Sequence, residues 1–178
     1  FDTLVKSFPS LIALGAARAG DERVRAVLAV NLYQECGEGD PSRSHHAIYR
    51  KFLEGAGLQV GDAPDADFAL RWRDALRDHL LSAPPGSVLG ALAAGEFLAQ
   101  PALSRLYPVL QAHFPDADQE YFTHHLELEA EHVEEITGVL KLQVEADGGT
   151  KDLAQGFEVG LAAWEDYFSG LNSALAAR

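Results

Sequence analysis

Residues 125–132 read His125-Leu126-Glu127-Leu128-Glu129-Ala130-Glu131-His132, within a longer stretch that has helical periodicity. His125, Glu129 and His132 are spaced i, i+4 and i+7, so an α-helix places all three on one stripe. Two imidazoles and a carboxylate on one stripe make up half of a transition-metal site. The stretch therefore predicts a helical protein, and the remaining ligands should come from other helices.

The length and composition are those of one globular domain, residues 1–178. Hydrophobic residues make up 47% of the chain and charged residues 23%, which argues against disorder. A chain of 178 residues is long enough to bury a sizeable core. The formal net charge of -13 argues against nucleic acid or an anionic membrane as a partner, because both bind basic patches.

The chain has a single cysteine, Cys36. One thiol excludes an intramolecular disulfide framework and a cysteine-based zinc site, and it favours a reducing, cytoplasmic location. No stretch approaches the roughly 18–20 continuous apolar residues of a membrane span, and none has the pattern of a signal peptide. The sequence begins at Phe1 and contains no Met, so we expect the natural start, with a short N-terminal element, to precede it.

Helical periodicity covers almost the whole chain, and strand-like alternation is nearly absent. Caps, glycines and prolines divide it into helices over 9–18, 21–36, 41–54, 65–82, 87–100, 101–114, 116–146 and 151–176. Pro9 falls in a first turn, and Pro101 begins or kinks its segment. The predicted N-caps are Asp40 (followed by Pro41), Asp65, Asp116 or Asp118, and Thr150. There is no internal repeat or long linker, so we expect a compact all-α bundle of about seven helices.

Three polar residues stand among apolar ones on the predicted helices. Glu96 is the only charged residue of the apolar segment 87–100, and a buried carboxylate is costly unless it is paired or bound to a metal. The alternative is a Glu96 that reaches solvent or pairs with Arg105. Glu35 follows the inward stripe of its helix, with Glu38 as a close alternative in the next loop. His45 lies in the first turns of the following helix, where a structural histidine is the ordinary alternative.

The other polar residues do not fit a shared site. His46 and His124 are each rotated by about 100° from a candidate ligand next to them. His79 and His113 have no partner at ligand spacing, and we expect them to be structural or exposed. The charged side chains that form the solvated face of the long helix are expected to be Glu127, Glu131, Glu134 and Glu135.

Taken together, six residues on four helices supply three carboxylates and three imidazoles: Glu35, His45, Glu96, His125, Glu129 and His132. This is the ligand set of a carboxylate-rich di-iron or di-manganese site inside a helical bundle. A standard ferritin-like site needs two Glu-x-x-His motifs, and the chain has one, from Glu129 to His132. A zincin is excluded because the sequence has no His-Glu-x-x-His motif.

Two motifs resemble those of the haem-oxygenase-like di-iron oxidases and oxygenases, also called iron-containing redox enzymes. The first runs from Asn31-Leu32-Tyr33-Gln34-Glu35-Cys36-Gly37-Glu38-Gly39-Asp40-Pro41 through His45 to Phe52-Leu53-Glu54-Gly55-Ala56-Gly57-Leu58. The second, more specific motif is Tyr121-Phe122-Thr123-His124-His125-Leu126-Glu127-Leu128-Glu129-Ala130-Glu131-His132. Family members usually have Asp where this chain has Glu129, and Glu reaches one methylene further and can still bind a metal. The resemblance covers the chain from about Pro9 onward.

The resemblance implies a seven-helix haem-oxygenase-like fold, a non-haem centre of two iron ions (or one iron and one manganese), and the six residues above as its ligands. It also implies O2 and a small organic substrate as reactants, with C–C cleavage or desaturation of fatty or amino acids, or N-oxygenation of amines, often in biosynthesis. Relatives of this fold suggest a homodimer. The aromatic residues expected to line the pocket or the core are Tyr33, Tyr49, Phe97 and Trp164.

Other functions remain open on the sequence alone. One is a metal-free enzyme on the same fold, either similar to thiaminase II, whose nucleophile lies elsewhere than Cys36, or a cofactor-free oxidase similar to pyrroloquinoline-quinone synthase. Another is a non-catalytic helical binding protein. Haem binding is disfavoured because no histidine lies early in the first helix.

Overall fold

The computed structural model describes residues 1–58, 66–145 and 149–177, without the side chains of 129–131. Within them, the chain forms seven α-helices and one short 3-10 helix. No strand occurs among these residues, and the predicted all-α architecture is confirmed. The elements are α1 (Asp2–Arg18), α2 (Glu22–Glu35), η1 (Pro41–Arg43), α3 (His45–Gly55), α4 (Asp67–Ser82), α5 (Pro85–His113), α6 (Glu120–Glu145) and α7 (Gly149–Ala176).

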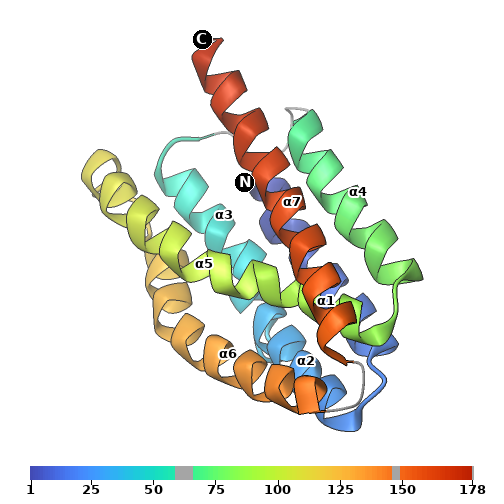
Figure 1. The fold of residues 1–178 in the computed structure, drawn as a ribbon. Helices are drawn as coiled ribbons and strands as arrows, with labels where there is room; N and C mark the ends of the chain where they lie inside the picture. The colour runs from blue at the N-terminus through green and yellow to red at the C-terminus, as the bar shows by residue number, and fades with distance from the viewer. Residues whose placement is uncertain (59–65, 146–148, 178) are drawn as a thin grey trace.

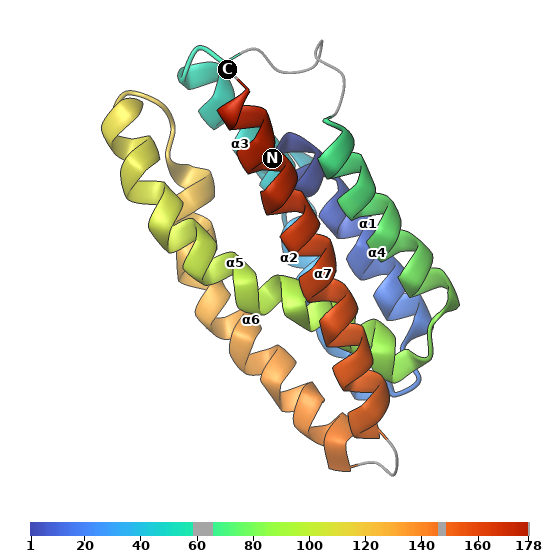
Figure 2. The same cartoon turned by 45° about the horizontal axis from the view of Figure 1, so that its top comes forward.

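Helix α5 runs through the middle of the bundle, between α6 on one side and α7 on the other (Figure 1). Helices α1, α4 and α7 lie side by side, and α2 packs against both α1 and α6 (Figure 2). Helix α3 contacts α1 and α6. Each helix therefore turns one face toward α5 or toward a neighbour of α5, which is how a single core forms from amphipathic helices.

The central place of α5 depends on small residues where it meets α7. A Cβ atom on Gly90 would collide with the backbone of Leu153, and one on Gly156 with the backbone of Ser87. Because the two backbones approach this closely, the run from Gly86 to Glu96 is buried on every side. Glu96 is thus a carboxylate at the end of an enclosed apolar segment.

The first helix begins earlier than predicted, at Asp2 and not at residue 9, and Pro9 lies inside it. The reason is packing, because Leu4 is buried on the same face as Leu11 and extends the apolar stripe by two turns. Proline at position 9 removes only the hydrogen bond to the carbonyl of Val5, and the helix continues.

The segments predicted as 87–100 and 101–114 form one helix, α5, with Pro101 and Pro108 inside it. Leu103 is buried, and Tyr107 and Leu110 pack against the same apolar cluster, so tertiary contacts hold the helix on both sides of Pro101. Packing here outweighs the helix-breaking preference of proline.

The predicted N-cap Asp40 is confirmed for the next helix, but that helix is a short 3-10 turn, and the predicted cap Thr150 is wrong. Asp40 caps the 3-10 helix η1, and α3 begins only at His45, where Ser44 Oγ accepts a hydrogen bond from the backbone N–H of Ala47 at 3.2 Å. Thr150 lies within α7, which begins at Gly149. Asp118, one of the two residues predicted to cap α6, accepts a hydrogen bond of 2.9 Å from the N–H of Glu120, the first residue of the helix. Asp65 lies outside the described residues.

Candidate metal centre

Three of the predicted ligands, from α2, α3 and α6, lie close together. One nitrogen or oxygen atom from each of Glu35, His45 and His125 lies within 4.8 Å of the other two, a spacing that one metal ion can bridge. Glu35 and His45 are 5% and 1% exposed, and His125 is partly buried. Residues from α2, α3 and α6 therefore meet at one enclosed point.

The turn between α2 and α3 brings Glu35 and His45 together. Gly37, Glu38 and Gly39 follow one another with φ angles of 82°, 57° and 94°, left-handed values that favour glycine. This tight reversal returns the chain so that His45 Nδ1 lies 2.9 Å from Glu35 Oε2. Glu38 is exposed on the outside of the turn, so of the two carboxylates that the sequence left open, Glu35 is the one at the cluster.

The His45 ring has nitrogens that are not satisfied within the protein. Nδ1 faces Glu35 without forming a hydrogen bond, and Nε2 has no hydrogen-bond partner among the described residues. A buried polar atom without a partner is rare and calls for a reason. A ligand that accepts the lone pair of a neutral imidazole, as a metal ion does, is one such reason.

One ring nitrogen of His125 forms a hydrogen bond within the protein, and the other has a lone pair that can bind a metal. Nδ1 lies 3.1 Å from the carbonyl oxygen of Tyr121, one turn earlier on α6. Because a carbonyl only accepts, Nδ1 carries the proton and the lone pair is on Nε2. The His125 ring stands 4.2 Å from the ring of His45, centroid to centroid.

A second group, from α2, α5 and α6, lies beside the first. His132 Nδ1 is 3.8 Å from Glu96 Oε2, and two amide side chains support the pair. Asn31 donates a hydrogen bond of 3.1 Å to Glu96 Oε1. Gln34 Oε1 lies 2.9 Å from His132 Nε2, so Nε2 donates to it and the lone pair of Nδ1 faces Glu96.

Burial shifts the protonation of both groups. It raises the pKa of Glu96 to about 8, with the charge of nearby Glu35 adding to the rise and the Asn31 hydrogen bond opposing it. Burial also lowers the pKa of His125 well below its ordinary value, and His45 lowers it further. Without a metal, both side chains therefore favour their neutral forms near pH 7.

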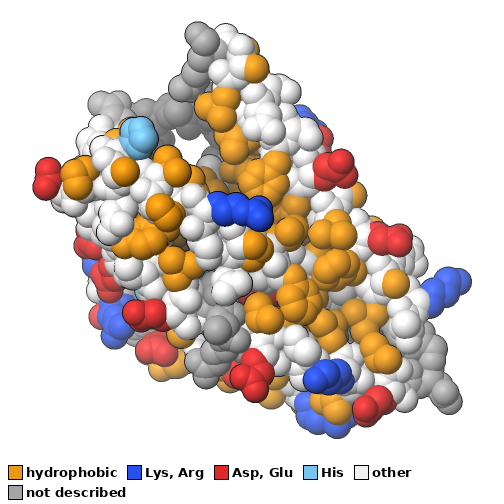
Figure 3. Space-filling view, turned by 60° about the vertical axis from the view of Figure 1, so that its left-hand side comes forward, with side chains coloured by type: hydrophobic (Ala, Val, Ile, Leu, Met, Phe, Trp, Pro, Cys, Tyr) orange, Lys and Arg blue, Asp and Glu red, His pale blue; other side chains and the backbone are white. Residues whose placement is uncertain are grey.

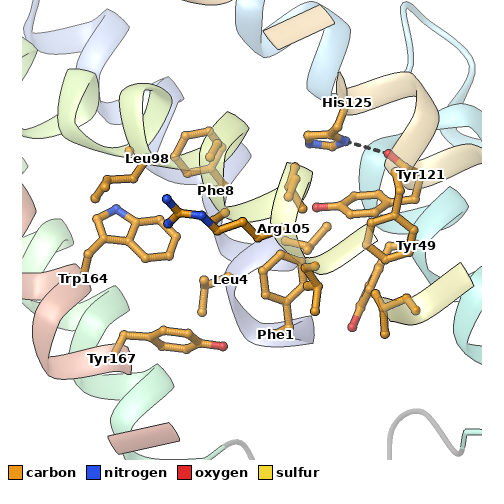
Figure 4. A pocket seen from close by; sticks show the side chains of 18 of the residues that line it. Phe1, Leu4, Phe8, Tyr49, Leu98, Arg105, Tyr121, His125, Trp164 and Tyr167 are labelled. Carbon is orange, nitrogen blue, oxygen red and sulfur yellow. Dashed lines mark hydrogen bonds between the residues drawn. The ribbon is translucent and has the colours of Figure 1, made fainter. Parts of the chain in front are cut away.

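The cluster forms the inner end of an apolar cavity of about 740 Å³ that is lined mainly by α1, α3, α5, α6 and α7, with Glu35, Glu96 and His125 among its lining residues. Hydrophobic side chains gather on the face where this cavity opens (Figure 3). Phe8, Tyr49, Tyr121 and Trp164 project into it (Figure 4). The volume is within the range of roughly 300–1,000 Å³ that is typical of small-molecule sites.

The structure brings together five of the six residues singled out in the sequence. The side chain of the sixth, Glu129, lies outside the described residues. Glu96 does not pair with Arg105, since its oxygens face Asn31 and His132. Tyr33 is 55% exposed and away from the cavity.

The remaining assignments are mostly as expected. Tyr49 and Trp164 line the cavity, while Phe97 packs in the core against Phe157. His79 contacts Ser87, and His113 is exposed. The sequence reasoning missed Gln34, whose signal was an amide next to Glu35 at the end of its helix.

None of the described helices combines the length and the apolar character needed to span a bilayer. Two solved structures are similar to this chain, both of a CADD-like protein of unknown function from Nostoc punctiforme. One has a TM-score of 0.85 at 19% identity and covers 97% of this chain and 78% of that one. The other has a TM-score of 0.80 at 18% identity, with 99% and 77% covered. At such identities the similarity concerns the fold.

No curated protein matches the chain. A family model described as "Iron-containing redox enzyme" matches residues 3–165, which span α1 to most of α7 and include all six residues singled out in the sequence. The chain therefore belongs to the iron-containing redox enzyme family of haem-oxygenase-like proteins.

Proposed function

We propose that this protein is an O2-activating non-haem di-iron oxidase or oxygenase that acts on a small organic substrate. The observation that carries the proposal is the convergence of two carboxylate–imidazole groups at the closed end of an apolar cavity. Membership of an iron-containing redox enzyme family supports iron as the metal. The substrate is expected to be a fatty acid, an amino acid or an amine.

The donor atoms fit iron. Glu35, His45 and His125 would hold one ion, because the His45 ring lacks hydrogen bonds within the described protein and Nε2 of His125 keeps its lone pair. Glu96 and His132 would hold the second, with Glu129 as the further ligand proposed from sequence. Imidazole and carboxylate sets of this kind suit iron. When bound, iron would supply the redox chemistry with O2.

The protein's own residues orient and shield the centre. Tyr121 fixes the proton on Nδ1 of His125, Gln34 fixes it on Nε2 of His132, and Asn31 aims Glu96. Such supporting hydrogen bonds set the direction of a ligand's lone pair. The apolar wall of the cavity excludes water from the reacting end, so a substrate that fills the cavity meets the centre in a dry environment.

Iron stoichiometry tests the proposal. After anaerobic loading with Fe(II) and desalting, we expect about two irons per chain, and a marked loss in His125→Ala with the helical circular dichroism spectrum preserved. The matched control is His113→Ala, which removes an exposed histidine and should keep both irons. The absence of iron from wild type would overturn the proposal and leave a cofactor-free oxidase or a binding protein on the same fold.

A further inference from the structure

A single cation lines the cavity among the described residues. Arg105, on the second half of α5, is the one lysine or arginine in that lining. Its guanidinium points toward Trp164 of α7 and away from His125 (Figure 4). The cavity therefore has two polar ends of opposite character: buried carboxylates and imidazoles inside, and one guanidinium toward the opening.

Arg105 has no carboxylate partner within the described part of the chain, although the protein has a net charge of -13. By contrast, Arg71 pairs with Asp166 at 2.9 Å and Arg77 with Asp78 at 2.9 Å. A guanidinium has five donors in a fixed fork that matches a carboxylate. An unpaired arginine in an acidic protein is thus available for an anion from outside.

The surroundings of Arg105 favour an anion that carries an apolar body. Exposed hydrophobic side chains around the opening are Phe1, Leu58, Leu106, Val109 and Phe168. An apolar chain that passes this rim buries hydrophobic surface, which stabilises binding in proportion to the buried area. At the inner end the described lining has no lysine or arginine to attract a carboxylate, whereas Arg105 supplies a positive charge toward the opening.

We propose that Arg105 binds the carboxylate of a substrate that has an apolar body, so that the end of the molecule opposite the carboxylate faces Glu35, Glu96 and His125. The orientation rests on the proposed function, because it assumes that the reaction takes place at the metal centre. Binding itself does not require iron, and it can be tested with or without the metal.

Binding of decanoate tests the role of Arg105. In isothermal titration calorimetry, Arg105→Gln should weaken decanoate binding by about tenfold or more, because a charge-assisted bidentate contact is lost, and should leave decan-1-ol binding unchanged. Arg105→Lys should restore part of the affinity. The matched control, Arg77→Gln, changes the net charge equally but lies away from the cavity, and should bind decanoate like wild type. Equal losses for acid and alcohol, or no loss, would overturn the proposal.

The position of bromine tests the orientation. In crystals soaked with 10-bromodecanoate, the anomalous signal of bromine should lie at the inner end, near His125. Bromine at the opening would overturn the orientation. Both measurements are made on metal-free protein and on protein loaded anaerobically with Fe(II). If the loss of decanoate affinity in Arg105→Gln disappears when iron is loaded, the proposed orientation is also overturned. Failure to load iron contradicts the proposed function alone, since the metal-free measurement is independent of it.

Discussion

The two halves of the candidate centre differ in how much of their polar chemistry the protein itself satisfies. In the first half, His45 Nε2 has no hydrogen-bond partner in the described structure, and Nδ1 faces Glu35 without a hydrogen bond. In the second half, Asn31 donates a hydrogen bond to Glu96 and Gln34 accepts one from His132, while Asn31 Oδ1 is the polar atom of this half that has no partner among the described residues. Glu35, His45, Glu96 and His132 are all buried, so the difference between the halves does not come from access of these groups to water.

This difference indicates two ways of preparing a metal ligand. In the first half, the lone pairs of the His45 ring and of Glu35 face one another without a proton between them. A metal ion bound there would give these unsatisfied atoms a partner. The second half orients its ligands beforehand through amide side chains, and Glu96 stays neutral until its proton is displaced. We therefore expect the first half to bind metal more readily near pH 7, and the second to depend on pH and on its amides.

The largest effect is expected at His45. His45→Ala removes a ligand of the first half and should reduce iron from about two per chain to about one or none, as measured by elemental analysis after anaerobic loading. His46→Ala is the matched control, because His46 is the next residue but turns outward, with Nε2 3.0 Å from Asp2 Oδ1. Equal iron contents in the two variants would show that the first half is not a metal site.

Glu96 should make the metal-free protein less stable as the pH rises. Its pKa is about 8 in the folded protein against 4.5 as the ordinary value, so between these pH values the unfolded chain releases a proton that the folded chain keeps. The free energy of unfolding therefore falls from about pH 4.5 to about pH 8. Glu96→Gln should remove this slope and be the more stable protein at pH 8 in urea titrations, whereas Glu158→Gln, on exposed surface, should keep it.

His125 should act in the opposite direction. The pKa of His125 in the folded protein is well below the ordinary value of 6.5. As the pH falls below about 6.5, the unfolded chain therefore binds a proton at this ring that the folded chain does not bind. The free energy of unfolding should therefore decrease on acidification, and His125→Leu should flatten that decrease in the same urea titrations. If the free energy of unfolding of His125→Leu fell on acidification as steeply as that of wild type, this would contradict the burial of the His125 ring as a neutral group.

Asn31 should have a smaller effect, confined to the second half. Asn31→Leu removes the hydrogen bond to Glu96 Oε1 while keeping a side chain of similar size, and supporting residues of this kind change metal affinity by about 10–100-fold. We expect the second iron to dissociate more readily in competition with a chelator, with the first iron unaffected. Equal weakening of both irons would mean that Asn31 acts on the fold and not on Glu96.

The fold could be predicted from sequence more completely than its helix boundaries. Helical periodicity predicts the all-α architecture, but it places Pro9 in the first turn of a helix and lets Pro101 begin or kink one, because proline disfavours helix interiors. Packing overrode that local preference: buried Leu4 extends α1 toward the N-terminus, and Leu103 holds α5 beyond Pro101. Which preference prevails depends on contacts between distant helices, and a single sequence does not contain them.

The candidate site shows the same division. His125 and His132 follow from helical spacing, and Glu96 from its apolar neighbours, because those signals are local. The choice between Glu35 and Glu38 depends on the left-handed turn at Gly37, and the role of Gln34 depends on a contact with α6, 98 residues away. Local sequence patterns identify residues that need a partner, but the identity of that partner depends on how distant helices pack in the fold.

The smallest effect is expected at Ser44, which caps α3 one residue before His45. Ser44→Ala removes the hydrogen bond from Ala47 N–H and should lower the free energy of unfolding by about 1 kcal/mol, as measured in urea. Iron content should stay near that of wild type, because Ile48 and Phe52 anchor α3 in the core. If Ser44→Ala instead lost iron as His45→Ala does, the turn and not the packing of α3 would hold His45 in place. The first half would then depend on a local backbone support, as the second depends on its amides.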